Sequence, residues 1–155
     1  MLRIGVISDT HNFLDPKVLQ LFNGVDHILH GGDIGLPWLL LDLERIAPVT
    51  AVRGNTDDAS LGYQLTQTIQ LAGRKFLLHH IVNPHSIEAS SPISRESPDV
   101  VIFGHTHKPF SEFIGKTFFF NPGYAGKSRF GMERSIAILK CDEQRIEPQY
   151  LKLAS

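Results

Sequence analysis

The sequence predicts an α/β fold with mixed β-sheets, and three features of its 155 residues carry this prediction. The first third of the chain alternates short β-branched segments with amphipathic segments of helical spacing, which is the pattern of a βαβαβ unit. The rest consists mainly of strand-like segments joined by tight turns. No repeat, linker or low-complexity tract divides the chain, so residues 1–155 are expected to form a single domain.

The βαβαβ portion begins with a strand that is expected at residues 2–7. A helix is expected over residues 16–23, because Asp15 suits the N-cap and Pro16 suits the first helical position. Gly24 suits the end of this helix, and the apolar residues within it share one face.

Two more strands and a second helix complete this portion. The strands are expected at residues 25–29 and 48–52, where apolar β-branched residues gather. An apolar helix is expected between them, beginning at Pro37 and ending near Arg45.

The later part of the chain is expected to form antiparallel pairs around turn residues. The pairs are residues 64–71 with 75–78 around Gly73-Arg74, 110–114 with 117–120 around Gly115-Lys116, and 134–140 with 145–153 around Asp142-Glu143-Gln144. A buried strand is expected at residues 99–103. Residues 86–98 are expected to form a loop or a short helix, because they are rich in serine and contain two prolines.

Charge and cysteine content exclude several classes of protein. Fifteen Lys and Arg residues against sixteen Asp and Glu residues give a formal charge of −1, so a general nucleic-acid binder is disfavoured. The single cysteine, Cys141, forms no internal disulfide and no thiolate metal cluster. No apolar run reaches the roughly 20 residues of a membrane span, and an acid at Asp9 comes too early for a signal peptide. A soluble, cytoplasmic protein without membrane contact is expected.

Five apolar strands are each followed by a side chain that is able to bind a metal ion. These side chains are Asp9, His11, Asp33, Asn55, His79, His105 and His107. The successive strand ends are 22 to 26 residues apart, which matches one strand and its return. The strand ends therefore gather at one edge of a sheet, where α/β folds bind their ligands.

The chemistry of this set indicates divalent metal ions. Carboxylate, amide oxygen and imidazole suit a first-row divalent ion, and the lack of thiolate argues against a structural zinc site. Seven ligands are too many for one tetrahedral ion, whereas two ions about 3.5–4 Å apart and sharing a carboxylate use them naturally. Mn²⁺ is the first expectation, with Fe, Zn²⁺, Co²⁺ and Ni²⁺ chemically acceptable.

The order of these motifs resembles a known family. Asp9-x-His11, Gly32-Asp33, Gly54-Asn55, His79 and Gly104-His105-x-His107 are similar to the signature of the calcineurin-like metallophosphoesterases. Length and the later Asn121-Pro122-Gly123 favour the small prokaryotic phosphodiesterase branch. The resemblance covers Ile4 to Gly123 and implies a four-layer α/β/β/α sandwich with two mixed β-sheets.

The resemblance also implies an activity and a role for each ligand. The activity is hydrolysis of a small phosphate ester, in particular a diester, by a hydroxide that bridges two divalent ions. Position by position, Asp9, His11 and His107 hold the first ion, Asn55, His79 and His105 hold the second, and Asp33 bridges them.

Three residues depart from the pattern of this family. Thr56 stands where the family commonly has the histidine of Gly-Asn-His, which contacts the phosphate. His80 follows His79 where glycine is usual, which leaves open a role for His80 as a general acid. Tyr124 stands where serine is usual. No catalytic residue beyond the ligands is assigned.

Other interpretations remain beside these. The alternative function is a non-catalytic protein-binding scaffold on the same fold, like a eukaryotic retromer subunit with a damaged metal site. His30 is expected to orient the site by hydrogen bonding rather than to ligate. The three aromatic residues 118–120 are expected to show one face away from the core, which leaves a homo-oligomer open.

Overall fold

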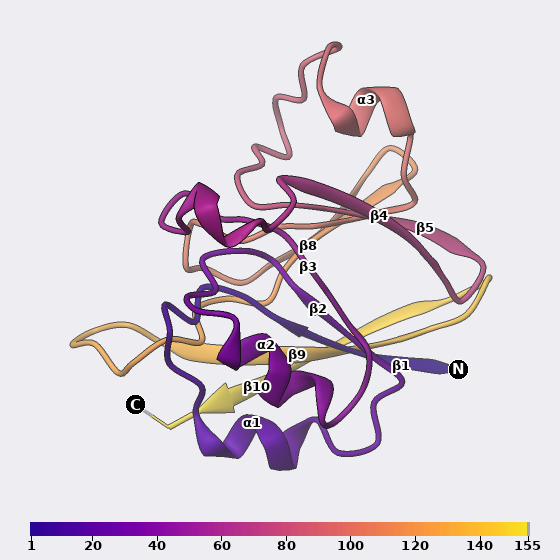
Figure 1. Cartoon of the computed structure of the whole chain (residues 1–155). Helices are drawn as coiled ribbons and strands as arrows, with labels where there is room; N and C mark the ends of the chain where they lie inside the picture. The colour runs from indigo at the N-terminus through magenta and orange to yellow at the C-terminus, as the bar shows by residue number, and fades with distance from the viewer. Residues whose placement is uncertain (155) are drawn as a thin grey trace.

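The structure, a computed structural model that describes residues 1–154, consists of two five-stranded mixed sheets packed face to face. In Figure 1, α1 and α2 lie beneath one sheet and α3 lies above the other. The first sheet contains β1 (Leu2–Ile7), β2 (His27–His30), β3 (Val49–Ala51), β9 (Arg134–Cys141) and β10 (Ile146–Leu153). The second contains β4 (Thr66–Leu71), β5 (Arg74–His79), β6 (Val100–Ile102), β7 (Phe110–Ile114) and β8 (Thr117–Asn121). The helices are α1 (Pro16–Leu21), α2 (Trp38–Glu44), α3 (Pro92–Glu96) and the 3₁₀ turn η1 (Ala59–Leu61).

Both sheets have a parallel centre and antiparallel neighbours. The order of the first is β10-β9-β1-β2-β3, in which β1, β2 and β3 are parallel and come from the βαβαβ unit. The order of the second is β4-β5-β6-β8-β7, in which β5, β6 and β8 are parallel and β4 and β7 are antiparallel edge strands. The predicted four-layer α/β/β/α sandwich is confirmed.

Local signals explain where the elements begin and turn. The Asp15 side chain accepts a hydrogen bond from the Lys17 backbone N–H at 2.9 Å and caps α1, as its N-cap position predicts. The β4–β5 turn is one residue earlier than predicted, at Ala72-Gly73, where φ is +55° and +74°. Two consecutive left-handed residues match the twist of paired strands, which explains the position of the turn.

Three apolar cores hold the layers together, and the aromatic run of β8 contributes to two of them. Phe118 and Phe120 pack between the sheets, while Phe119 packs on the outer face with Ile93 of α3. All three rings are at most 4% exposed. The expectation of an uncovered aromatic face is therefore wrong, because the fourth layer covers Phe119.

The parallel strands explain where a site can form. The carboxyl ends of β1, β2 and β3 lie at one edge of the first sheet, and those of β5 and β6 lie at the matching edge of the second. Within residues 1–154, no helix is long and apolar enough to cross a membrane.

The inter-sheet core predicts a large loss of stability for Phe120→Ala. This ring is fully buried between the sheets, so its removal should lower the free energy of unfolding by about 3–5 kcal/mol. Phe113→Ala is the matched control. Phe113 is 54% exposed, so its removal should lower the free energy of unfolding by less than about 1 kcal/mol. Urea unfolding measures both, and equal losses would contradict this description of the core.

Candidate metal centre

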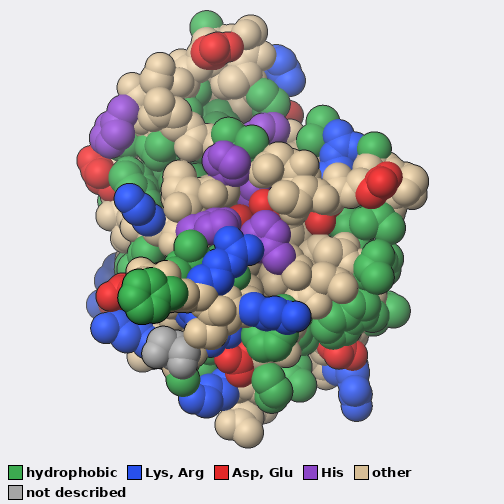
Figure 2. All heavy atoms as spheres, turned by 90° about the vertical axis from the view of Figure 1, so that its left-hand side faces the viewer, with side chains coloured by type: hydrophobic (Ala, Val, Ile, Leu, Met, Phe, Trp, Pro, Cys, Tyr) green, Lys and Arg blue, Asp and Glu red, His purple; other side chains and the backbone are tan. Residues whose placement is uncertain are grey.

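Loops from both sheets meet at the edge where the parallel strands end. The Asp9 backbone N–H donates to the Gly32 carbonyl at 3.0 Å, which joins the loops after β1 and β2. The Gly104 N–H donates to the His80 carbonyl at 3.0 Å, which joins the loops after β6 and β5. Figure 2 shows histidine side chains in the middle of this face, with carboxylates between them.

Asp9, His11 and His107 form one group of potential ligands. His107 Nε2 lies 3.4 Å from Asp9 Oδ1, and His11 Nε2 lies 4.0 Å from the same oxygen. Asp9 is buried, whereas both histidines are partly exposed. The group therefore opens to solvent on its histidine side.

Asp9, Asp33 and His80 form a second group that shares Asp9 with the first. His80 Nε2 lies 3.1 Å from Asp33 Oδ2 and 3.8 Å from Asp9 Oδ1. His11 Nε2 lies 3.8 Å from Asp33 Oδ2, so Asp33 of the second group also lies near a histidine of the first group.

Asn55 and His105 lie beside the second group. His105 Nδ1 donates to Asn55 Oδ1 at 3.0 Å, and the His105 ring centroid lies 5.4 Å from that of His80. The structure thus brings together most of the residues that the sequence proposes, namely Asp9, His11, Asp33, Asn55, His105 and His107.

His79 does not join these groups, and His80 takes its place. Side chains of β5 alternate between faces, so that Leu78 packs between the sheets and Leu77 packs on the outer face. His80 continues the inner set, whereas His79 continues the outer set and forms a 2.8 Å hydrogen bond with Thr66 Oγ1 through Nδ1. The structure therefore places His80, rather than the expected His79, beside the two carboxylates. The strand alternation was the available signal, but two consecutive leucines obscured which face was inner.

His80 is held in an orientation that suits a ligand. Its Nδ1 donates to the Gly31 carbonyl at 2.7 Å, which fixes the ring, and the neighbouring Asp33 and Asp9 carboxylates raise the pKa of His80 against the opposing effect of burial. The ring is 3% exposed, and Nε2 faces Asp9 and Asp33. Neither ring nitrogen is presented to the solvent side, which argues against the general-acid role.

Each carboxylate uses one oxygen within the protein and turns the other toward the histidines. Asp9 Oδ2 accepts from Ser8 Oγ at 2.7 Å and from the His105 N–H at 3.1 Å. Asp33 Oδ1 accepts from the Thr56 N–H at 2.8 Å. Asp9 Oδ1 and Asp33 Oδ2 therefore remain for a ligand.

Asp57 holds the loop after β2 against the loop after β3. Its carboxylate accepts the backbone N–H groups of Ile34 and Gly35 at 3.0 Å and of Gly54 at 2.9 Å. These bonds fix the loop that carries Asp33. Sequence reasoning missed this residue, because an aspartate three positions after a glycine has the pattern of an ordinary turn.

The backbone at the proposed ligands is unusually left-handed. Values of φ between +46° and +74° occur at Asp9, His11, Asp33, His105 and His107. This conformation is unfavourable for L-residues, although aspartate and histidine tolerate it better than most. Its concentration at one edge of the fold is typical of a functional site.

Glycines let the backbone approach the carboxylates. A Cβ atom on Gly54 would collide with the backbone N and Oδ1 of Asp33. A Cβ atom on Gly104 would collide with Ser8 Oγ and Asp9 Oδ2. Side chains at these two positions would therefore displace the groups that the site needs.

The electrostatics of the site reflect buried charge. Burial raises the pKa of Asp9 to about 6, against the opposing effects of Ser8 and His80. Burial also opposes ionisation of Asp33, but the adjacent His80 ring and the Thr56 N–H hold the pKa of Asp33 well below its ordinary value. Burial is the main cause that lowers the pKa of His11, so this ring is neutral at pH 7.

The arrangement fits a divalent metal ion. Asp9 Oδ1, His11 Nε2 and His80 Nε2 are buried and have no hydrogen-bond partner among residues 1–154. Each such atom costs about 1–3 kcal/mol unless a partner satisfies it. His107 Nε2 and His11 Nε2 lie 3.4 and 4.0 Å from Asp9 Oδ1, and donors about 2.1 Å from one ion lie about 3–4 Å apart. The fold and the site therefore define a protein with candidate ligand groups for divalent metal ions.

His30 lies beneath the site and orients it, in agreement with its expected role. It is fully buried, and its Nδ1 accepts the Gly32 N–H at 3.1 Å while its Nε2 bonds to Thr10 Oγ1 at 3.0 Å. Burial lowers the pKa of His30 to about 3, so the ring stays neutral. These bonds hold the glycine that precedes Asp33.

Comparison with known proteins identifies the family. A profile of the calcineurin-like phosphoesterase superfamily domain matches residues 2–144, and the chain belongs to this superfamily. A probable metallophosphoesterase from Methanothermobacter thermautotrophicus is 31% identical, with 96% of this chain and 91% of the relative covered. The phosphodiesterase YfcE of Escherichia coli is 30% identical, with 92% of this chain and 89% of the relative covered.

Solved structures agree with this assignment. An archaeal phosphodiesterase superimposes with a TM-score of 0.79 at 25% identity, with 98% of this chain and 100% of that chain covered. Vps29 from Chaetomium thermophilum superimposes with a TM-score of 0.77 at 17% identity, with 99% and 97% covered, which shows a shared fold. The resemblance seen in the sequence motifs is confirmed.

The correction at β5 predicts different outcomes for two adjacent histidines. His80→Ala should lose about one bound Mn²⁺ per chain, because His80 faces both carboxylates. His79→Ala should keep the wild-type metal content, because its ring bonds to Thr66 instead. Elemental analysis after dialysis against Mn²⁺ and then metal-free buffer measures this, and metal loss confined to His79→Ala would overturn the assignment.

Metal binding is expected to weaken as the pH falls. Protons compete for the imidazole nitrogens and for Asp9, whose pKa is raised to about 6, so Mn²⁺ affinity should fall about tenfold or more from about pH 7.5 to about pH 5.5. Titration calorimetry in buffers of different ionisation enthalpy measures the affinity and the protons released. An affinity that is constant across this range would contradict ligation by histidine.

Proposed function

We propose that this chain is a phosphodiesterase that works with two divalent metal ions, with Mn²⁺ as the first candidate. The observation that carries the proposal is the convergence of buried carboxylate and imidazole atoms, three of them without a partner among residues 1–154, at one edge of the two sheets. The phosphodiesterases among its relatives support the same reaction.

The geometry favours a division of the ligands between the two ions. Asp9, His11 and His107 are proposed for one ion, Asn55, His80 and His105 for the other, and Asp33 for a position between them. When bound, two such ions lower the pKa of a water molecule held between them and polarise a phosphate ester. The chain itself keeps the donors in place, through the Thr56 N–H on Asp33 and the Gly31 carbonyl on His80.

A cavity beside the second group supports an ester with an organic substituent. The cavity has a volume of about 400 Å³ and adjoins Asn55 and His80. Leu65 and Ile81 give it apolar walls, and Arg53 adds a positive charge. A ring or short chain of the substrate fits this space, so a diester is favoured over free phosphate.

Thr56 supports the same preference. Its backbone N–H is already bonded to Asp33, and the residue carries no imidazole to protonate a leaving group. Esters whose leaving group departs without a proton should therefore react faster than simple alkyl monoesters.

Metal-dependent hydrolysis of bis-p-nitrophenyl phosphate tests the proposal. Protein stripped of metal should be inactive, added Mn²⁺ should restore turnover, and excess chelator should abolish it. Asp33→Ala should lower kcat about 10³-fold or more, and His11→Ala should lower it less, because Asp33 is proposed to lie between the two ions whereas His11 is proposed for one ion only. Asp26→Ala is the matched control, since Asp26 is exposed and lies before the opposite end of β2.

Three results would contradict this function. Absence of turnover in protein that binds Mn²⁺ would favour the protein-binding scaffold. Equal residual rates for Asp33→Ala and His11→Ala would contradict the position of Asp33 between the ions. Faster hydrolysis of alkyl monophosphates than of the diester would overturn the substrate preference.

A further inference from the structure

Tyr124 connects the metal centre to the loop that precedes β9. Its ring centroid lies 4.7 Å from that of His107 and 6.2 Å from that of His11, and the residue is 1% exposed. Its hydroxyl donates to the Lys127 carbonyl at 2.8 Å. The ring therefore contacts two proposed ligands on one side and fixes the start of the loop 127–133 on the other.

Arg129 of this loop lies against the Tyr124 ring. The guanidinium carbon is 5.3 Å from the ring centroid, which is the geometry of a cation–π contact. Arg129 is exposed, and no carboxylate of residues 1–154 forms a salt bridge with it. Its charge is therefore available to an anion.

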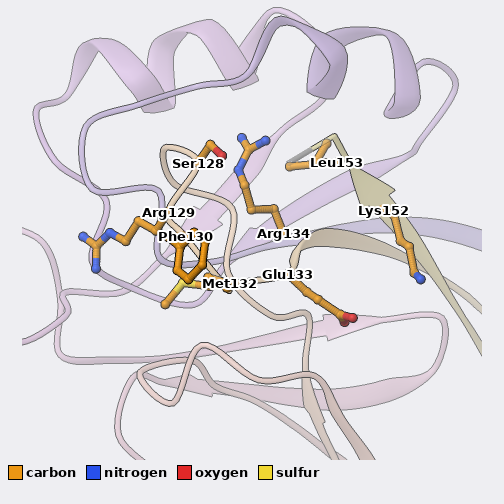
Figure 3. A pocket seen from close by; sticks show the side chains of 9 residues that line it. Ser128, Arg129, Phe130, Met132, Glu133, Arg134, Lys152 and Leu153 are labelled. Carbon is orange, nitrogen blue, oxygen red and sulfur yellow. The ribbon is translucent and has the colours of Figure 1, made fainter.

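Arg134, the second arginine of this region, has a structural role. Arg134 is buried, donates from Nε to the Gly126 carbonyl at 2.6 Å and pairs with Asp15 at 3.0 Å. The loop lines a cavity of about 620 Å³ together with Lys152 and Leu153. In Figure 3, the Arg129 side chain extends away from Lys152, which lies on the other side of the view. Arg134 thus anchors the loop through its hydrogen bonds, whereas Arg129 contacts the Tyr124 ring and has no such role in holding the loop.

Arg129 lies near the metal centre, because the same Tyr124 ring centroid is 5.3 Å from the Arg129 guanidinium carbon and 4.7 Å from the His107 ring centroid. A free cation this close to a site for divalent cations is unfavourable unless an anion lies between them. An anionic ligand shared by Arg129 and the metal centre resolves this repulsion.

We propose that Arg129 binds a non-bridging oxygen of the substrate phosphate at the rim of the metal centre, and that Tyr124 positions it. This assignment rests on the proposed function and deepens it. The planar fork of a guanidinium matches phosphate oxygens. The proposal also links the departures at Thr56 and Tyr124. Thr56 has no imidazole to contact the phosphate, and Arg129, positioned by Tyr124, supplies a phosphate contact instead.

The test compares Arg129→Gln with Arg145→Gln in Mn²⁺-loaded protein. Arg145 is the matched control, because it is an exposed arginine paired with Glu147 in the β9–β10 region. Titration calorimetry with inorganic phosphate should show a Kd about 10- to 100-fold higher for Arg129→Gln and unchanged for Arg145→Gln, since a charge-assisted hydrogen bond is lost. Elemental analysis should show unchanged metal content in both variants.

Kinetics with bis-p-nitrophenyl phosphate separate binding from structural damage. Arg129→Gln should raise KM more than it lowers kcat, and Arg129→Lys should recover part of the loss because it keeps the charge. Tyr124→Phe removes the bond to Lys127 and should raise KM by a smaller factor. The double variant Arg129→Gln/Tyr124→Phe should raise KM no further than Arg129→Gln alone, since Tyr124 acts through Arg129.

The outcomes distinguish this inference from the proposed function. A phosphate Kd for Arg129→Gln within twofold of the wild type overturns the role of Arg129, whatever the turnover. Wild-type protein that binds Mn²⁺ and phosphate but hydrolyses no diester overturns the proposed function and leaves the phosphate contact standing. Additive effects of the Tyr124 and Arg129 substitutions overturn the positioning role of Tyr124.

Discussion

The burial of two carboxylates beside histidine nitrogens is the constraint on which the site depends. Asp9 and Asp33 are at most 2% exposed, and each directs one oxygen toward the same small group of imidazoles. Charge in such a place is unfavourable unless it is paired. The protein satisfies the outer oxygens with Ser8, Thr56 and the His105 backbone, and it leaves the inner ones for a cation.

The two-sheet architecture makes this arrangement possible. Parallel strands bring their carboxyl ends to one edge, so short loops suffice to place donors from distant parts of the chain side by side. Residues that are not proposed ligands also hold the loops in place, among them Asp57 between two loops and His30 beneath them. The left-handed backbone at five donors persists because these contacts over-determine it.

Most of the fold could be predicted from the sequence, because its signals are local. Asp15 and Pro16 mark a helix start, and glycine-containing turns mark the hairpins, so the element order follows with errors of one or two residues. Most of the donors could be predicted for the same reason, since each follows an apolar strand. The identity of the histidine that faces the site from the end of β5 could not be predicted, because Leu77 and Leu78 are both apolar and only packing against the first sheet decides which face of β5 is inner. The roles of Asp57 and Arg129 could not be predicted either, because the partners of Asp57 lie far away in the chain and the partner of Arg129 lies across a loop.

The donors are split between the two halves of the polypeptide, and this has a consequence during synthesis. Asp9, His11, Asp33 and Asn55 emerge from the ribosome first, and His80, His105 and His107 follow only after the second sheet has begun. A growing chain that ends before residue 80 lacks three of the proposed ligands, namely His80, His105 and His107. The complete set of proposed ligands is therefore assembled only when both sheets have been synthesised and have packed together.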